Sequence, residues 1–76
     1  MKEVNNMSKR FTAVIKHENP WWIGWIEEVP GVNCQEHSRE ELLITLKKTL
    51  EEALEFNRQE AIEAAGAFFE EEVLLV

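Results

Sequence analysis

The fold is decided by residues 11–36, which read FTAVIKHENPWWIGWIEEVPGVNCQE. Over residues 11–17 the side chains alternate between two faces and include β-branched types, which is typical of a strand. Asn19-Pro20 then favours a turn, and residues 21–27 form a second strand candidate that holds all three tryptophans. Because the link between the two is short, we expect an antiparallel hairpin.

A turn and a helix start follow the hairpin. Pro30-Gly31 predicts a tight turn, since proline presets φ and glycine tolerates a positive φ. Residues 32–36 then read as a short third strand. Ser38 and Glu41 have the spacing of a capping box, in which the hydroxyl and the glutamate satisfy the first free amides of a helix.

The helix is expected to be long. Apolar residues recur at steps of three and four, as on one face of an amphipathic helix: Leu42, Leu43, Leu46, Leu50, Ala53, Leu54, Ala61 and Ile62. Gly66 suits the position just after its end. From Ser38 to Ala65 the helix measures roughly 40 Å at 1.5 Å per residue. Asn57-Arg58 interrupts the apolar stripe, so the helix is either continuous or broken there.

The last segment, residues 69–76, is predicted to be a strand because it ends in Val73-Leu-Leu-Val76. The expected order is therefore βββαβ, an α+β two-layer domain with an antiparallel sheet and one long helix across one face. Residues 1–9 are polar and are expected to be a flexible N-terminus. Residues 10–76 are expected to form a single domain.

Composition narrows the possible functions. The 76 residues include fifteen glutamates, no aspartate and eight lysines and arginines, for a net charge of −7. Such a chain is a poor nucleic-acid binder and suits a basic protein partner. A core this small is thin, so we expect self-association. The lone Cys34, the lack of a signal peptide and the lack of a membrane-spanning run predict a cytoplasmic protein.

No catalytic, metal or cofactor site is expected. His17 and His37 are twenty residues apart with no ligand cluster at metal spacing, so exposed histidines are the preferred interpretation. Cys34 could be a nucleophile with His37 as its base, but positions three apart on a strand point to opposite faces. The paired glutamates read as solvated faces, and no nucleophile elbow or phosphate loop is present. We therefore do not expect an enzyme.

The tryptophans are the most informative cluster. Trp21 and Trp25 share one strand face and Trp22 lies on the other, so one group belongs to the core and the other to an interface; the sequence leaves open which. The candidate residues for a partner or subunit interface are Trp21, Trp22, Trp25, Glu27, Glu28, Phe68 and Phe69.

These motifs, taken in order, resemble the HicB-like antitoxin domain. The resemblance rests on Phe11-Thr-Ala-Val-Ile15, Trp21-Trp-Ile-Gly24, Glu28-Val-Pro-Gly-Val32 with Gln35, and Ser38-Arg-Glu-Glu-Leu42 opening the helix. It covers about residues 10–76, and Glu51-Glu-Ala-Leu-Glu-Phe-Asn-Arg58 with the closing acidic-apolar strand resembles short stand-alone members of the family. Glu36 departs from the pattern, because the family often has glycine after the glutamine of the third strand.

The resemblance implies a partial ribonuclease-H-like fold without nuclease activity. It also implies the antitoxin of a type II toxin-antitoxin system, which neutralises a small basic HicA-type mRNA-cleaving toxin by direct binding. No appended DNA-binding domain is expected, so neither is direct binding to nucleic acid. The alternative is an orphan HicB-like structural or regulatory homo-oligomer with no toxin partner, in which residues 68–76 pair with a neighbouring subunit.

Overall fold

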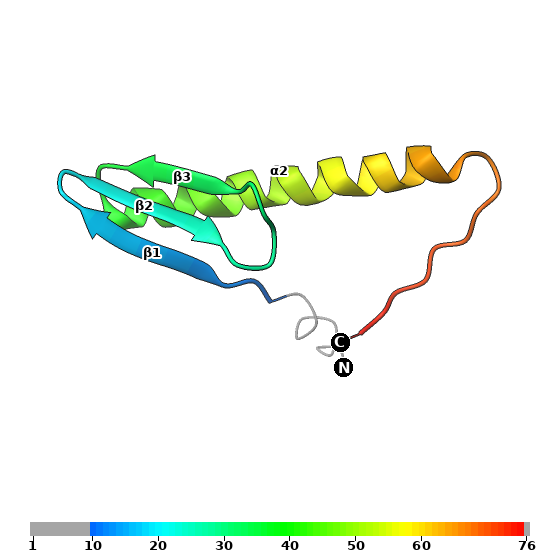
Figure 1. The fold of residues 1–76 in the computed structure, drawn as a ribbon, viewed down its shortest axis with the longest axis horizontal. Helices are drawn as coiled ribbons and strands as arrows, with labels where there is room; N and C mark the ends of the chain where they lie inside the picture. Colours follow the sequence, from blue (N-terminus) through cyan, green and yellow to red (C-terminus); the bar gives the residue numbers. More distant parts are fainter. Residues whose placement is uncertain (1–9, 76) are drawn as a thin grey trace.

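The computed structural model describes residues 10–75 as a three-stranded sheet followed by one long helix (Figure 1). The elements are β1 (Ala13–Glu18), β2 (Trp21–Ile26), β3 (Asn33–Glu36) and α2 (Arg39–Ala65). The sheet order is β1-β2-β3, with both pairs antiparallel. The predicted α+β arrangement, with an antiparallel sheet and one long helix across one face, is confirmed. Residues 1–9, expected to be flexible, lie outside the described residues.

The strand register sorts the side chains of the sheet into two faces. Gly24 lies opposite Ile15 of β1 and Cys34 of β3, so these residues share the face that α2 covers. Trp22 and Ile26, two positions either side of Gly24, point to the same face. The intervening residues of β2 point to the other face, which no helix of the described chain covers (Figure 1).

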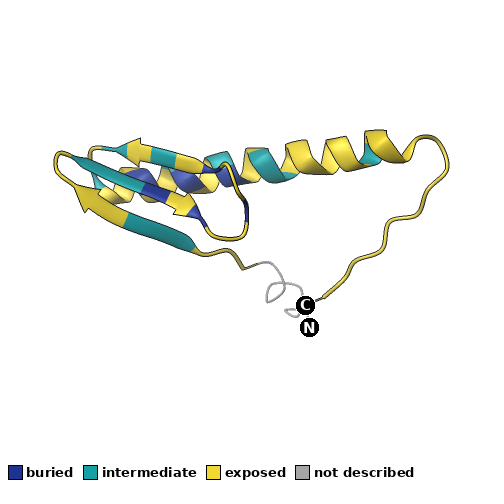
Figure 2. Ribbon diagram, viewed as in Figure 1, coloured by how far each residue is buried: buried dark blue, intermediate teal, exposed yellow. Residues whose placement is uncertain are grey.

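The core lies between this sheet and the first half of α2 (Figure 2). Its buried members come from the helix, from the end of β2 and from the turn that follows: Ile26, Val29, Val32, Leu42, Leu46 and Leu50. Gly24 lets the helix come close. A Cβ atom at Gly24 would lie 2.9 Å from the Val14 carbonyl oxygen, a distance that real Cβ atoms essentially never show. It would also lie 3.0 Å from Leu46 Cδ1, which is tighter than most real Cβ contacts.

The predicted helix start is confirmed by its cap. The Glu41 amide donates to Ser38 Oγ at 3.1 Å, and Ser38 is in an extended conformation, as an N-cap requires. The helix then runs without a break to Ala65 and ends at Gly66, whose φ is 84°. No helix within residues 10–75 combines the length and the apolar character needed to cross a membrane.

Asn57 does not break the helix, which decides the question that the sequence left open. Polar side chains one turn apart support the backbone around it. Gln59 Nε2 donates to Glu55 Oε2 at 2.8 Å, and Arg58 Nη1 lies 3.8 Å from the same oxygen. Such pairs contribute about 0.2–0.5 kcal/mol each, so they favour the helical backbone at this polar turn.

The predicted last strand is wrong for the described residues. Residues 67–75, here called the C-terminal arm, form no strand; after the end of α2 they turn back and run as exposed chain (Figures 1 and 2). The reason is a mismatch in length. Ala53 and Leu54 are the last helix residues packed on the core, so residues 55–65 extend about 16 Å beyond it at 1.5 Å per residue. The arm therefore begins far from the sheet.

Truncation of a core leucine tests where this fold derives its stability. We expect Leu46→Ala to lower the free energy of unfolding by about 2–5 kcal/mol, because Leu46 is 2 % exposed and packs over Gly24. Ile44→Ala, two residues away and 71 % exposed, is the matched control and should change it by less than about 0.5 kcal/mol. Urea unfolding at one fixed protein concentration provides the measurement. Equal effects of the two substitutions would contradict this packing of the helix.

Candidate partner-binding surface

The face of the sheet opposite α2 carries a row of apolar side chains. We call it the open sheet face and define it by the residues that point away from the helix: Val14, Lys16, Glu18, Trp21, Ile23, Trp25, Asn33 and Gln35. Trp25 is 40 % exposed, and Trp21 and Ile23 are half-buried. Trp25 lies opposite Val14 on β1, and the polar Lys16, Asn33 and Gln35 flank the row. The result is an apolar strip with polar sides.

Trp22 belongs to the core, and this decides the second question that the sequence left open. Its side chain packs against the buried cluster beneath α2 and stacks on His17, with ring centroids 4.3 Å apart and planes 7° from parallel. The candidate interface residue Trp22 is thus on the helix-facing side. Trp21 and Trp25 are the pair that remains on the open sheet face.

The two histidines do not form a metal pair. His37 stacks on Trp21 with ring centroids 4.3 Å apart, whereas His17 stacks on Trp22. Since Trp21 and Trp22 point to opposite faces of β2, the imidazoles lie on opposite sides of the sheet. Within residues 10–75 no group of three or more metal-ligating side chains comes together.

Cys34 and His37 are also kept apart. Cys34 is half-buried under the helix, where its Sγ lies 3.5 Å from Thr49 Oγ1. His37 is engaged with Trp21 on the other side of the sheet. The side chains therefore have the arrangement of a structural thiol and an aromatic stack, and they do not form a nucleophile and its base.

Glu36, the residue that departs from the HicB-like pattern, has a structural contact. Thr45 Oγ1 of the helix donates to Glu36 Oε2 at 2.7 Å. Together with the Cys34–Thr49 contact, this hydrogen bond joins β3 to α2 along one side of the helix. A glycine at position 36 would lack it.

The adjacent glutamates after β2 differ in their surroundings. Glu28 Oε1 accepts a hydrogen bond of 2.7 Å from the Thr12 amide, and this bond holds the pKa of Glu28 below its usual value. The Glu27 amide donates to the Thr12 carbonyl oxygen at 2.9 Å, while its side chain is exposed. Glu28 therefore fastens the start of β1 to the turn, and Glu27 is left free for solvent or a partner.

Lys16 and Glu18 form a second local arrangement of charge on β1. Lys16 Nζ lies 2.8 Å from Glu18 Oε2, and this hydrogen-bonded ion pair lowers the pKa of Glu18. Both side chains are at least half exposed, so the pair contributes little to stability. Its consequence is that the carboxylate of β1 is already matched by a positive charge.

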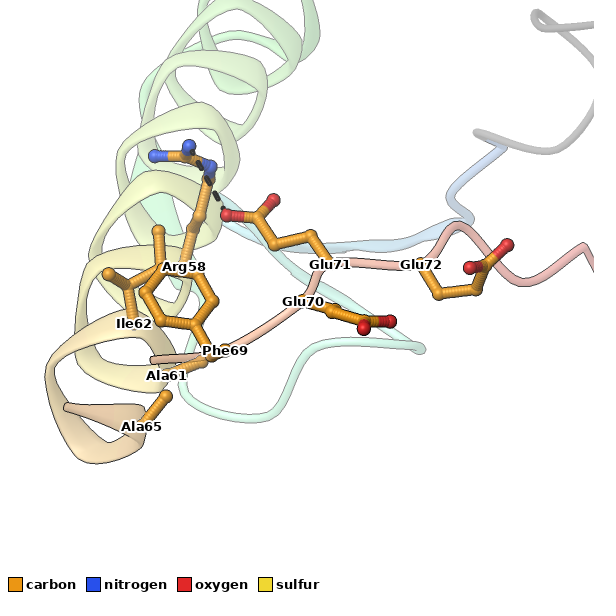
Figure 3. Close-up of a pocket in the computed structure, with 8 residues that line it drawn as sticks. All are labelled: Arg58, Ala61, Ile62, Ala65, Phe69, Glu70, Glu71 and Glu72. Atoms are coloured by element: carbon orange, nitrogen blue, oxygen red, sulfur yellow. Dashed lines mark ion pairs between the residues drawn. The ribbon is translucent and has the colours of Figure 1, made fainter. Parts of the chain in front are cut away.

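The C-terminal arm touches the helix at one hollow of about 290 Å³, shown in Figure 3. Phe69 lies beside Ile62, and Arg58 Nη2 is 4.0 Å from Glu71 Oε2. The remaining lining consists of Ala61 and Ala65 with Glu70 and Glu72. The lining is mainly apolar on the helix side and acidic on the arm side, so the hollow is where the arm packs on the outer part of α2.

The seven candidate interface residues fall into separate places. Trp21 and Trp25 share the open sheet face, Trp22 is beneath the helix, Glu27 and Glu28 are in the turn after β2, and Phe68 and Phe69 are in the arm. The candidates omitted Ile23. Strand alternation places it on the same face as Trp21 and Trp25, so the sequence could have predicted it. They also omitted residues 73–75, although an uninterrupted apolar run is typical of an interface segment.

Comparison with known proteins gave no match, either to a family model, to a curated protein or to a solved structure.

The hydrogen bond from the Thr12 amide to the Glu28 carboxylate predicts that the free energy of unfolding falls at acid pH. Because the pKa of Glu28 is lower in the folded chain than the ordinary value of 4.5, the stabilisation is present above that value and is lost as pH falls through the folded-state pKa. Glu28→Gln retains an oxygen to accept from Thr12 but does not titrate. We expect its stability to fall less steeply than that of the wild type below about pH 4.5, measured by urea unfolding as a function of pH.

Glu27→Gln is the matched control for this experiment, since it removes the same charge one residue away. We expect it to keep the acid dependence of the wild type. If both variants gave the same curve, the Thr12–Glu28 hydrogen bond would not be the source of the effect.

Proposed function

We propose that this chain is a protein-binding module that recognises its partner with the open sheet face. The observation that carries the proposal is the uncovered row of Trp21, Ile23 and Trp25. Tryptophan is enriched among the residues that dominate binding energy, and an apolar strip with a polar border is typical of a protein interface. A rigid sheet also presents the strip without ordering a loop on binding, which favours affinity.

We propose a HicB-like antitoxin of a type II toxin-antitoxin system as the specific form of this module. The partner is then a small basic HicA-type toxin that cleaves mRNA, and the complex forms in the cytoplasm. The order of strand, strand, strand and capped helix supports this proposal, as does the acidic charge of −7. The chain would act by covering the RNA-binding surface of the toxin, so it needs no catalytic residue.

Charge has a separate role from the apolar strip in this mechanism. Glu27 is exposed just after the end of β2, and Glu40 and Glu41 are exposed in the first turn of the helix. Opposite charges accelerate the encounter of two proteins, and salt screens this effect. Affinity would then come from desolvation of the strip, while the glutamates set the rate of association.

The second candidate function is a structural or regulatory homo-oligomer of the HicB-like type with no toxin partner. It is favoured by the C-terminal arm, where Phe68 is 97 % exposed and Leu74 is 80 % exposed. Exposed apolar residues in such number are typical of surfaces that become covered on assembly.

The first test is affinity capture of the tagged chain from its native host at low salt, followed by binding and RNA-cleavage assays with the recovered protein. We expect a small basic ribonuclease that high salt releases and that the purified chain inhibits. Trp25→Ser should weaken its binding at least about tenfold, while Ile44→Ser, an exposed position on the helix, should not. Recovery of the chain with no other protein would contradict the antitoxin proposal and favour the homo-oligomer.

A second experiment separates the effect of charge on the association rate from the effect of direct contacts on the dissociation rate. Replacing Glu27, Glu40 and Glu41 by glutamine should slow association at low salt and leave dissociation nearly unchanged, because exposed charges act mainly before contact. Stopped-flow kinetics at several salt concentrations measure both rates. An association rate equal to that of the wild type at low salt would show that these glutamates do not steer the toxin.

A further inference from the structure

We infer that the C-terminal arm binds a second copy of this chain, and that its residues 68–75 add a strand to the free edge of β1 in that copy. Two copies would exchange arms reciprocally to give a symmetric dimer. The inference deepens the second candidate function and rests on self-association. It uses a surface other than the open sheet face, so its failure leaves the toxin proposal standing.

The arm has the composition of a strand but lacks the contacts of one. Val73, Leu74 and Leu75 are 75 %, 80 % and 65 % exposed. None of the backbone hydrogen bonds found within residues 10–75 outside the helix and strands involves the arm. Its contacts with the helix are the weak Arg58–Glu71 pair at 4.0 Å and the hollow beside Phe69 (Figure 3). An apolar β-prone segment of this kind gains both hydrogen bonds and burial by joining a sheet edge.

The edge of β1 is the better receptor of the two edges in the sheet. β1 has six residues and β3 has four, so β1 offers the longer ladder. The helix packs mainly on β2 and β3, which leaves the helix-facing side chains of β1, Ala13 and Ile15, only half-buried. A strand beside β1 would therefore fill the uncovered corner between β1 and α2.

The backbone of β1 is also in a suitable arrangement. Glu27 donates to the Thr12 carbonyl, so residues 12, 14, 16 and 18 direct their backbone groups toward β2. Residues 13, 15 and 17 then direct their amides and carbonyls to the free edge. In the arm, Val73 and Leu75 alternate with Leu74, so either register gives an apolar side chain to both the helix-facing and the open face.

A second copy suits the arm better than the β1 strand of its own chain. To return to its own sheet the arm has to run back over the roughly 16 Å by which residues 55–65 pass the core. It begins this return after Gly66, since Glu71 already lies beside Arg58 (Figure 3). That return takes about five residues at 3.3 Å each, which leaves residues 72–75 for pairing and places Phe68 and Phe69 off the sheet. If the outer halves of two helices lie antiparallel, the end of each helix lies beside the other sheet. An arm that swings forward then gives up only the 4.0 Å Arg58–Glu71 pair and the hollow beside Phe69, and the whole of residues 68–75 can pair.

The area involved is sufficient for a dimer. The exposed apolar side chains of one arm, Phe68, Phe69, Val73, Leu74 and Leu75, present on the order of 500 Å². Two arms and the surfaces that they cover then amount to roughly 2,000 Å², which is within the range of stable protein interfaces. Charge agrees in sign at Arg10, which precedes β1 and which Glu70, Glu71 and Glu72 of the arm would approach; Lys16 is already paired with Glu18.

Sedimentation velocity of the full chain over a broad dilution series tests the inference. We expect a reversible dimer, and we expect Val73→Ser combined with Leu74→Ser to raise its dissociation constant at least about tenfold through loss of apolar burial. Leu43→Ser combined with Ile44→Ser is the matched control, an adjacent exposed aliphatic pair on the helix, and should leave the constant unchanged. Circular dichroism verifies that all variants keep the fold, because none of these residues is buried.

Nuclear Overhauser spectroscopy of a mixture of ¹³C-labelled and unlabelled chains then locates the contact. Filtered spectra should show contacts between the methyl groups of residues 73–75 in one copy and Ala13 or Ile15 in the other. A chain that remains monomeric throughout the dilution series would overturn the inference. So would a dimer that the arm variant leaves intact, or arm–β1 contacts that occur only within one chain.

Discussion

The close packing of α2 on Gly24 is the contact on which the rest of the structure depends. Gly24 is at the centre of the middle strand, and Leu42 and Leu46 of the helix occupy the space that a side chain there would take. This contact fixes which face of the sheet is covered. It therefore places Trp22 in the core and leaves Trp21 and Trp25 on the surface, and it fixes the line along which the helix leaves the sheet.

A small sheet under a long helix yields a core that uses only part of the apolar sequence. Six apolar residues are buried, whereas ten large ones within the described chain are exposed, so most of the strongly apolar surface is still available for contacts. Five of the ten are in the arm and three are on α2, while Trp25 is on the open sheet face and Phe11 precedes β1. Half of the large exposed apolar residues are therefore in a segment that adds nothing to the core.

Local signals were sufficient to predict most of the fold. The hairpin, the Pro30-Gly31 turn and the Ser38 cap each depend on neighbouring residues, and each is found in the structure. The division of the tryptophans could not be predicted, because alternation separates Trp21 from Trp22 without indicating which face the helix covers. The last strand was predicted wrongly because residues 73–75 have strand composition, while their pairing depends on the distance from Gly66 to the sheet.

Because α2 extends past the sheet, its two halves differ in local stability. The inner half of the helix is held by Leu42, Leu46 and Leu50, so its amides open to solvent only when the core does. Residues 55–65 have mainly side-chain pairs one turn apart, and helices of this length are marginal in water without tertiary contacts. Hydrogen exchange should therefore proceed inward from Gly66, and docking of any protein along this half would protect amides that the isolated chain exposes frequently.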